Sequence, residues 1–334
     1  MTGPVTGPVI GTVTAASPGH GLAIETRGLT KKFGSQTAVN GIDLMVPRGS
    51  VFGFLGPNGS GKTTSIRMML GLSQATSGTI SVLGQSMPTQ LREVLPRVGA
   101  LVEGPAFYPF LSGAANLRRL DTADRFAPRS TRRARVQGAL ERVGLSHAAE
   151  KKVHAYSLGM KQRLGIANAL LLPRELLVLD EPTNGLDPQG TREVRSLVRS
   201  LAAEGTTVFV SSHLLAEVEQ MCTHAAVMSA GSLVAQGTLA QLRQVGESRV
   251  HLRTPDAAGA LRVLTHLGLE PARATSDAAD AVVVAPLGDT NWQPEAIVTA
   301  LVAGGVRIRG FAIVEPSLEE RFVALTGEGF DVVQ

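Results

Sequence analysis

The chain has 334 residues, enough for one large domain and one small domain. Aromatic residues make up 4%, which argues against a stacking surface for bases or sugars, and the single cysteine, Cys222, excludes an internal disulfide. Residues 245–334 hold 7 Lys/Arg and 12 Asp/Glu (net −5), so residues 1–244, with 25 basic and 16 acidic side chains, carry +9. This positive charge suits a polyphosphate ligand or an anionic membrane surface. An arginine-rich composition that is unrelated to any binding partner explains the charge equally well.

The N-terminal residues 1–21 are rich in Gly, Pro, Thr and Val and contain the tetrapeptide TGPV twice. They lack a basic start and an unbroken apolar core, so a signal peptide is not expected, and we predict a disordered tail. The sequence contains no run of about 18 apolar residues that would span a bilayer. We therefore expect a cytoplasmic protein whose role at a membrane requires a partner.

Residues 22–244 predict an α/β domain. Short apolar runs broken by turns over Leu22–Val51, with a strand-like alternation at Gly41–Val46, indicate an antiparallel sheet. Strands then alternate with helices, which is typical of a parallel sheet. The expected strands are Val51–Leu55, Thr79–Leu83, Leu176–Leu179 and Thr206–Val210, and the expected helices are Thr63–Leu70, Gly190–Ala203 and Leu214–Met221.

A largely helical block interrupts this alternation over residues 112–170 and predicts a separate helical subdomain at about 105–170. Its arginine-rich stretch Arg118–Arg135 is interpreted as a solvated helical face, or as a surface that approaches lipid headgroups or a membrane subunit.

Residues 245–334 predict a small α+β domain of the split βαβ, ferredoxin-like kind. The expected order is β-α-β-β-α-β, and such a domain would regulate, contact a second copy or be a passive appendage. Its expected elements are strands at Arg249–Leu252, Glu270–Thr275, Ala281–Val284 and Arg307–Ile313, with helices at Ala258–Leu267 and Pro294–Leu301.

A glycine-rich phosphate loop follows the first parallel strand, with the sequence Gly56-Pro57-Asn58-Gly59-Ser60-Gly61-Lys62-Thr63 followed by Thr64. The run matches G-x-x-x-x-G-K-[ST] between a strand and a helix, as the motif requires. Its glycines let backbone N–H groups turn toward phosphate oxygens, and the helix start adds positive potential. We expect Lys62 to reach the β- and γ-phosphates of ATP and the Thr63 hydroxyl to bind Mg²⁺.

Two carboxylates end the buried strand Leu176–Leu179. Asp180 is placed to hold Mg²⁺ directly or through water, and Glu181 is placed to polarise the attacking water as a general base. His213 follows another core strand, at the sheet edge where ligands of parallel sheets bind.

These residues together resemble the nucleotide-binding subunit of ABC transporters over residues 22–245. The family signature, LSGGQ, corresponds to Tyr156-Ser157-Leu158-Gly159-Met160, in which Ser157 and Gly159 match. The resemblance implies that these two residues contact the γ-phosphate bound by a second copy. It also implies that Asp187 lines the dimer interface, that His213 contacts the γ-phosphate and that Phe33 stacks on adenine. A core position is the alternative for Phe33.

One position departs from the family pattern, because Glu103 stands where a glutamine that touches Mg²⁺ is usual. Glu103 remains a candidate ligand of Mg²⁺ or water. This glutamate and the altered signature resemble the bacitracin- and lantibiotic-type drug exporters. The run Pro316–Phe322 is similar to the tails of daunorubicin-type ATPases.

The expected function is therefore that of the ATP-binding and ATP-hydrolysing subunit of an ABC exporter. It would act with a separate transmembrane permease and a second copy of itself or a homologous ATPase, at the inner face of the cell membrane, and not on nucleic acid. The alternatives are import, a non-transport P-loop enzyme, and a soluble ABC ATPase that acts on ribosomes or DNA. Proteins of the last kind usually carry two ATPase units or a long coiled-coil insertion.

Overall fold

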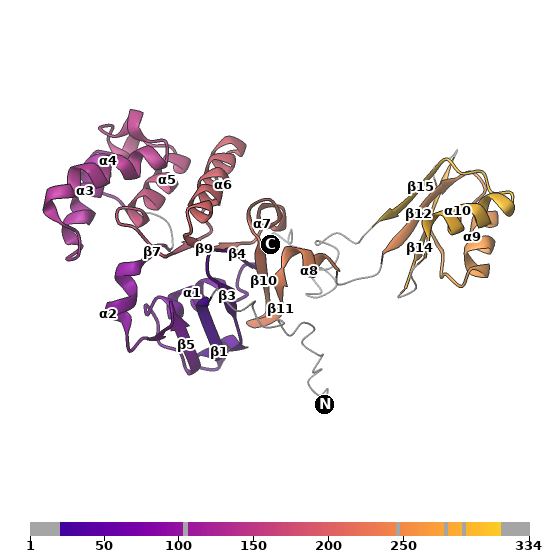
Figure 1. The fold of residues 1–334 in the computed structure, drawn as a ribbon, viewed down its shortest axis with the longest axis horizontal. Coiled ribbons are helices and arrows are strands. Elements are labelled where there is room, and N and C mark those ends of the chain that lie inside the picture. The colour runs from indigo at the N-terminus through magenta and orange to yellow at the C-terminus, as the bar shows by residue number, and fades with distance from the viewer. Residues whose placement is uncertain (1–20, 103–105, 245–247, 277–279, 289–291, 315–334) are drawn as a thin grey trace. The chain divides into compact units, whose positions relative to one another are not determined.

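The computed structural model describes residues 21–102, 106–244, 248–276, 280–288 and 292–314. The chain divides after Leu239 into two compact units, which are drawn in Figure 1. None of the helices in the described residues is both long and apolar enough to cross a membrane.

An antiparallel sheet opens the first unit. Its strands follow the order β2-β1-β5-β6, with β3 also paired to β1. Their bounds are Leu22–Phe33 (β1), Gln36–Ile42 (β2), Met45–Pro47 (β3), Ser77–Val82 (β5) and Gln85–Met87 (β6).

A six-stranded sheet with the order β11-β10-β4-β9-β8-β7 forms the centre of this unit. All neighbours pair in parallel except β10 and β11, which form an antiparallel hairpin. The bounds are Val51–Leu55 (β4), Val98–Leu101 (β7), Leu176–Asp180 (β8), Thr207–Ser212 (β9), His224–Ser229 (β10) and Ser232–Thr238 (β11).

The central strands β4, β8 and β9 are buried along their whole length, which explains why they contain nearly continuous apolar runs. Phe52 and Phe209 stack between β4 and β9 with ring centroids 5.8 Å apart. Because the three strands are parallel, their carboxyl ends meet at one edge, which is where the phosphate loop and Asp180 lie. Helices α1, α6 and α7 follow these strands and span Lys62–Met69, Pro188–Ala203 and Leu215–Met221.

Three helices form the helical subdomain: α3 (Gly113–Ala123), α4 (Arg132–Arg142) and α5 (Leu158–Ala169). They lie together and apart from strands β1 and β5 of the antiparallel sheet (Figure 1). The short helices are α2 (Leu91–Val94) and α8 (Leu239–Gln244).

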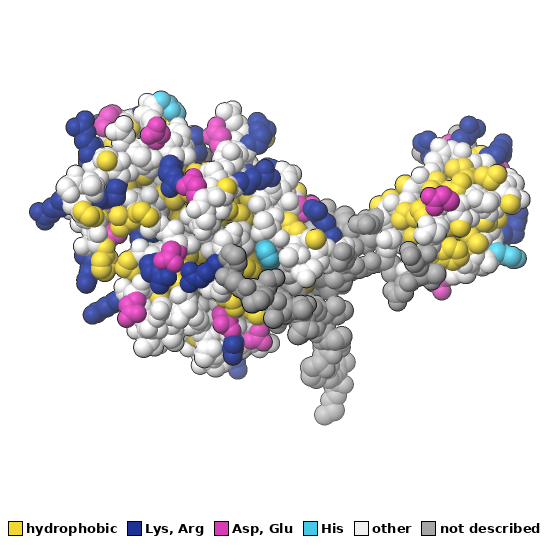
Figure 2. Space-filling view, viewed as in Figure 1, with side chains coloured by type: hydrophobic (Ala, Val, Ile, Leu, Met, Phe, Trp, Pro, Cys, Tyr) yellow, Lys and Arg dark blue, Asp and Glu magenta, His cyan; other side chains and the backbone are white. Residues whose placement is uncertain are grey.

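The arginine-rich stretch is only in part a solvated face. Arg132 and Arg135 both bind the carboxylate of Asp121, whose side chain is fully buried in α3. Arg119 lies over the exposed ring of Tyr108, 4.4 Å from its centroid. Figure 2 shows many dark blue side chains around the helical subdomain. The guanidinium groups of Arg132 and Arg135 hold α4 to α3 through Asp121.

Loss of the Asp121 carboxylate is expected to destabilise the first unit. An Asp121→Ala change leaves two largely buried guanidinium groups without their acceptor, which costs about 3–5 kcal/mol of unfolding free energy. Urea unfolding followed by circular dichroism measures this cost. The matched control is Glu150→Ala, because Glu150 is exposed and its 3.9 Å pair with Arg118 contributes at most about 1 kcal/mol. Equal stability of the two variants would contradict the structural role of Asp121.

The second unit has the β-α-β-β-α-β order and ferredoxin-like pairing that the sequence predicts. Its four strands pair antiparallel in the order β13-β14-β12-β15. The elements are β12 (Arg249–Thr254), α9 (Ala257–His266), β13 (Ala272–Ser276), β14 (Ala281–Pro286), α10 (Pro294–Ala303) and β15 (Gly310–Val314). A core between the sheet and the two helices contains Val250, Leu264, Val283 and Ile297.

Three predicted strands differ from the structure. Thr79–Leu83, expected among the strands of the parallel sheet, lies in β5, which pairs antiparallel with β1. Gly41–Val46 is not continuous, because β2 ends at Ile42 and the next residue, Asp43, accepts a hydrogen bond from the backbone N–H of Gly28 at 2.6 Å. The last strand begins at Gly310 and not at Arg307, because Arg307 binds the carboxylate of Asp256 through both its backbone N–H and its guanidinium.

Candidate functional site

The phosphate loop joins β4 to α1 as the sequence predicts. Gly59 and Gly61 have φ angles of 81° and 99°, which glycine adopts readily and other residues rarely adopt. A Cβ atom at Gly61 would lie 2.5 Å from the carbonyl oxygen of Ala38, so only glycine fits there. No side chain caps the first turn of α1, which leaves its N–H groups available to an anion.

Lys62 is buried and turns back onto the loop. Its Nζ donates to the carbonyl oxygens of Gly56 at 2.6 Å and Pro57 at 3.1 Å. Burial lowers the pKa of Lys62, while the charges of Glu181 and Asp180 oppose that shift. The two carboxylates favour the charged form of Lys62 and hold its side chain beside the loop. A bound phosphate would replace the contacts of Nζ with the carbonyl oxygens of Gly56 and Pro57.

Asp180 lies beside the start of α1. Its Oδ2 accepts a hydrogen bond from the Thr63 hydroxyl at 3.1 Å, and its Oδ1 accepts one from the Ser211 hydroxyl. Ser211 also accepts from the backbone N–H of Glu181 at 2.9 Å. The end of β9 therefore fixes both carboxylate residues at the end of β8, although the sequence analysis assigned Ser211 no role.

Glu181 lies beside two other predicted site residues, His213 and Lys62. Its Oε2 lies 2.7 Å from Nδ1 of His213, and its Oε1 lies 3.6 Å from Nζ of Lys62. The residue has a φ angle of 48°, a left-handed conformation that is uncommon for a residue with a side chain. Strain of this kind is typical of positions at functional sites, where the surrounding structure holds it.

An open cavity of about 600 Å³ brings most of the predicted nucleotide residues together. Phe33 is part of its lining and is 54% exposed, so the core alternative for this residue is wrong. Lys31 lies 4.9 Å from the Phe33 ring centroid. The predicted residues in the lining are Phe33, Asn58, Gly59, Gly61, Lys62, Thr63, Thr64 and Glu181.

Some predicted residues are absent from the lining of this cavity, namely Gly56, Pro57, Ser60, Asp180 and His213. The Ser60 hydroxyl is buried without a hydrogen-bond partner in the described residues and fills the space beside Gly56. The lining includes Ala230 and Gly231, from the β10–β11 turn, which the sequence analysis did not predict. Glu103 lies outside the described residues, as does the run 316–322.

The predicted signature residues line a different cavity, of about 440 Å³. Ser157 begins α5, and its hydroxyl accepts a hydrogen bond from the backbone N–H of Met160 at 3.2 Å. Asp187 begins α6 in the same manner and lines this cavity with Gly159. The two cavities share no lining residue, so Ser157 does not lie at the phosphate loop of its own chain.

Comparisons with known proteins agree with this geometry. The ABC transporter family model matches residues 39–184. The bacitracin transport ATP-binding protein BcrA of Bacillus licheniformis is 39% identical over 92% of this chain and 98% of its own length. The chain belongs to the ABC transporter family. The daunorubicin/doxorubicin resistance ATP-binding protein DrrA of Streptomyces peucetius is 34% identical over 92% of this chain and 94% of its own length.

Solved structures of the family share the fold of this ABC ATPase. An ATP-binding subunit of an ABC transporter aligns with a TM-score of 0.60 and 27% identity over 66% of this chain and 92% of that one. CbiO1 from Clostridium perfringens aligns with a TM-score of 0.61 and 25% identity over 74% of this chain and 96% of its own. The chain is thus an ATP-binding subunit of an ABC transporter, and its activity is ATP hydrolysis.

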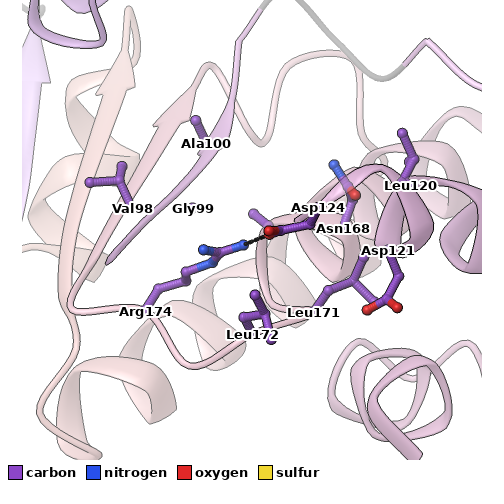
Figure 3. A pocket seen from close by; sticks show the side chains of 11 residues that line it. Val98, Gly99, Ala100, Leu120, Asp121, Asp124, Asn168, Leu171, Leu172 and Arg174 are labelled. Carbon is purple, nitrogen blue, oxygen red and sulfur yellow. Dashed lines mark hydrogen bonds and ion pairs between the residues drawn. The ribbon is translucent and has the colours of Figure 1, made fainter. Parts of the chain in front are cut away.

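A third cavity of the ABC ATPase, of about 240 Å³, lies between β7, the end of α3 and the segment after α5. Figure 3 shows Arg174 pointing across it toward Asp124, and the two charged groups are 3.5 Å apart. Burial lowers the pKa of Arg174, and the charge of Asp124 opposes that shift. None of the predicted site residues lines this cavity.

Proposed function

We propose that this ABC ATPase powers a separate membrane permease that exports an antibiotic, another drug or a lipid-like compound. The similarity to the bacitracin and daunorubicin proteins carries the proposal, because it extends over 92% of the chain. A match of that length includes most of the C-terminal unit and not only the nucleotide site, which all ABC ATPases share. The protein then acts at the inner face of the cell membrane, bound to its permease.

We propose that Thr63 and Asp180 hold Mg²⁺, with Glu103 as a further candidate. Their oxygens are the hard ligands that this ion prefers, and the two side chains lie 3.1 Å apart. In the described residues no three His, Cys, Asp or Glu side chains gather around a possible metal. This fits an ion that protein sites hold through one or two side chains together with phosphates, where it neutralises charge on the phosphates.

The chain's own groups perform the remaining steps of the proposed reaction. Lys62 leaves the carbonyl oxygens of the loop and binds phosphate, and Phe33 stacks on the adenine. Glu181 accepts a proton from the attacking water, and His213 orients its carboxylate through the 2.7 Å contact. Ser157 and Gly159 complete the site of a second copy, and Asp187 lies at the shared interface.

A soluble ABC ATPase that acts on ribosomes or DNA is the alternative function. Proteins of that class usually carry a second ATPase unit or a long coiled-coil insertion. The sequence has one phosphate loop, and the longest helix in the described residues, α6, has 16 residues. Neither observation favours the alternative.

Drug susceptibility of a sensitive bacterial host tests the export function. Expression of this chain together with its permease is expected to raise the inhibitory concentration of bacitracin, daunorubicin or a related compound. A Lys62→Ala variant should abolish the protection, whereas the exposed control Lys152→Ala should keep it. Unchanged susceptibility with an assembled, ATP-hydrolysing complex would contradict drug export.

A further inference from the structure

Glu217 in α7 is a buried carboxylate that the proposed mechanism does not use. It is 8% exposed, and in the described part of the chain no Lys or Arg lies within ion-pair distance of it. Its carboxyl group instead accepts hydrogen bonds from two hydroxyl groups. The hydroxyls of Thr183 and Ser212 both donate to the same oxygen, Oε2, and the second of these bonds is 3.3 Å long. The Leu214 carbonyl oxygen, at 3.4 Å, is the other acceptor near the Ser212 hydroxyl. A buried carboxylate held in this way is costly to remove from water, so its retention needs a reason.

The first hydroxyl belongs to the turn that carries Glu181. Thr183 is buried two residues beyond Glu181, and its carbonyl oxygen accepts from the backbone N–H of Leu186 at 3.1 Å. The carbonyl oxygen of Glu181 accepts from Asn184 N–H at 3.2 Å. These bonds make the turn one short unit, so the position of Thr183 determines where the left-handed Glu181 places its carboxylate.

The second hydroxyl belongs to the strand end that carries His213. Ser212 is buried, and its hydroxyl accepts from the backbone N–H of Leu214 at 3.0 Å, which encloses His213 in a tight turn. Its carbonyl oxygen accepts from the backbone N–H of Gly56 at 3.4 Å. Ser212 therefore fixes His213 relative to the first residue of the phosphate loop.

We propose that Glu217 is a positioning residue that joins these two segments and so sets the 2.7 Å contact between Glu181 and His213. The inference rests on the proposed roles of Glu181 and His213 in hydrolysis. One carboxylate oxygen accepts from both segments, so Thr183 and Ser212 cannot move apart without loss of a buried hydrogen bond. Glu217 itself is not part of the lining of the nucleotide cavity.

The position of Glu217 predicts a change in kcat and not in KM. Thr183, Ser212 and Glu217 are all absent from the lining of the 600 Å³ cavity, so their loss leaves the nucleotide contacts in place. It alters only the alignment of the base with its orienting histidine. Misplacement of reacting groups by about 1 Å is known to reduce rates by up to about a hundredfold.

Steady-state ATPase kinetics of the full chain test this role with four variants. Glu217→Ala is expected to lower kcat about tenfold to a hundredfold, with KM for ATP within about twofold of the wild type. Glu217→Gln keeps an oxygen that accepts from Thr183 and should retain most of kcat. Thr183→Val removes only the donor and should lower kcat as Glu217→Ala does. Glu219→Ala, on the same helix, is the control and should leave kcat and KM unchanged.

The double variant Glu217→Ala/Thr183→Val separates positioning from a general loss of stability. Two residues that act through one hydrogen bond should show no further loss of kcat when combined. Multiplicative losses, a rise in KM with kcat intact, or wild-type kcat in folded Thr183→Val would overturn the proposal. Valine has nearly the shape of threonine, so Thr183→Val still tests the proposal if Glu217→Ala does not fold. Failure of the proposed function has a different readout, because an active Glu181→Gln enzyme would show that Glu181 is not the base. The Glu217 and Thr183 variants test the positioning role separately.

Discussion

Replacement of Glu181 by glutamine is expected to lower ATP turnover by about a hundredfold or more while ATP binding persists. The amide has the shape of the carboxylate and can keep the hydrogen bond to His213, whose Nδ1 lies 2.7 Å away. It cannot accept a proton from water. The phosphate loop is unchanged, so the nucleotide still binds, and ATP-loaded dimers should accumulate because hydrolysis no longer separates them.

Phosphate release, equilibrium ATP binding and size-exclusion chromatography in ATP or ADP measure these effects. The control is Glu175→Gln, which changes a carboxylate just before the other end of the same strand, β8. Glu175 pairs with Arg97 and Arg48 at a partly exposed position, so its change should leave turnover unaltered and cost at most about 1 kcal/mol of stability. Near-normal hydrolysis by Glu181→Gln would remove Glu181 from the role of base.

The chain segments that the sequence predicted best carry their signal locally. The phosphate loop, β4 and β8 are contiguous runs in which residue type and backbone requirement coincide. Gly59 and Gly61 adopt positive φ angles, and β4 and β8 are buried throughout. The ferredoxin-like order of the second unit followed from alternating short strands and helices in the same way.

The β10–β11 hairpin was missed because its turn lacks the usual residues. Ala230 and Gly231 connect the strands with φ angles of 45° and 82°, where two-residue hairpins usually have Asn-Gly or Asp-Gly. The alanines of β10 also have low strand propensity, and pairing with β4 decides their conformation. Two residues of the nucleotide cavity wall were missed for this reason.

Contacts between distant residues were equally beyond sequence reasoning. Ser211 binds Asp180 across 31 positions, and Glu217 binds Thr183 across 34. The spacing between Ser211 and Asp180, or between Glu217 and Thr183, has no distinctive pattern in the sequence. The order of the strands in the sheet brings each pair together. The sequence therefore predicted the groups that would perform the chemistry, whereas the groups that position them became visible only in the fold.

Replacement of Ser157 by arginine is expected to abolish ATPase activity without weakening ATP binding to the single chain. Ser157 lies in the 440 Å³ cavity, away from the phosphate loop of its own chain, so its loss leaves that loop intact. An arginine there occupies the space into which a second copy would bring its γ-phosphate. If the proposed shared site is correct, turnover should fall to background.

A second arginine variant controls for the lost helix cap. Ser112 begins α3 with the same geometry, accepting a hydrogen bond from the backbone N–H of Ala115 at 3.2 Å. Ser112→Arg and Ser157→Arg each lose a cap that contributes about 1 kcal/mol. If the two serines share only the capping role, Ser112→Arg should lose the cap and still keep its ATPase activity.

Mixing two inactive variants decides whether the site is shared between copies. Lys62→Ala removes the phosphate contact, and Ser157→Arg removes the signature. If each site combines Lys62 of one copy with Ser157 of the other, a mixed dimer contains one site with both defects and one intact site, so activity returns. If both residues served the same chain, each copy would stay defective and the mixture would remain inactive. The expected result is recovered phosphate release when the two variants are mixed at a one-to-one ratio. A mixture that forms dimers but stays inactive would show that the signature does not complete the partner's site.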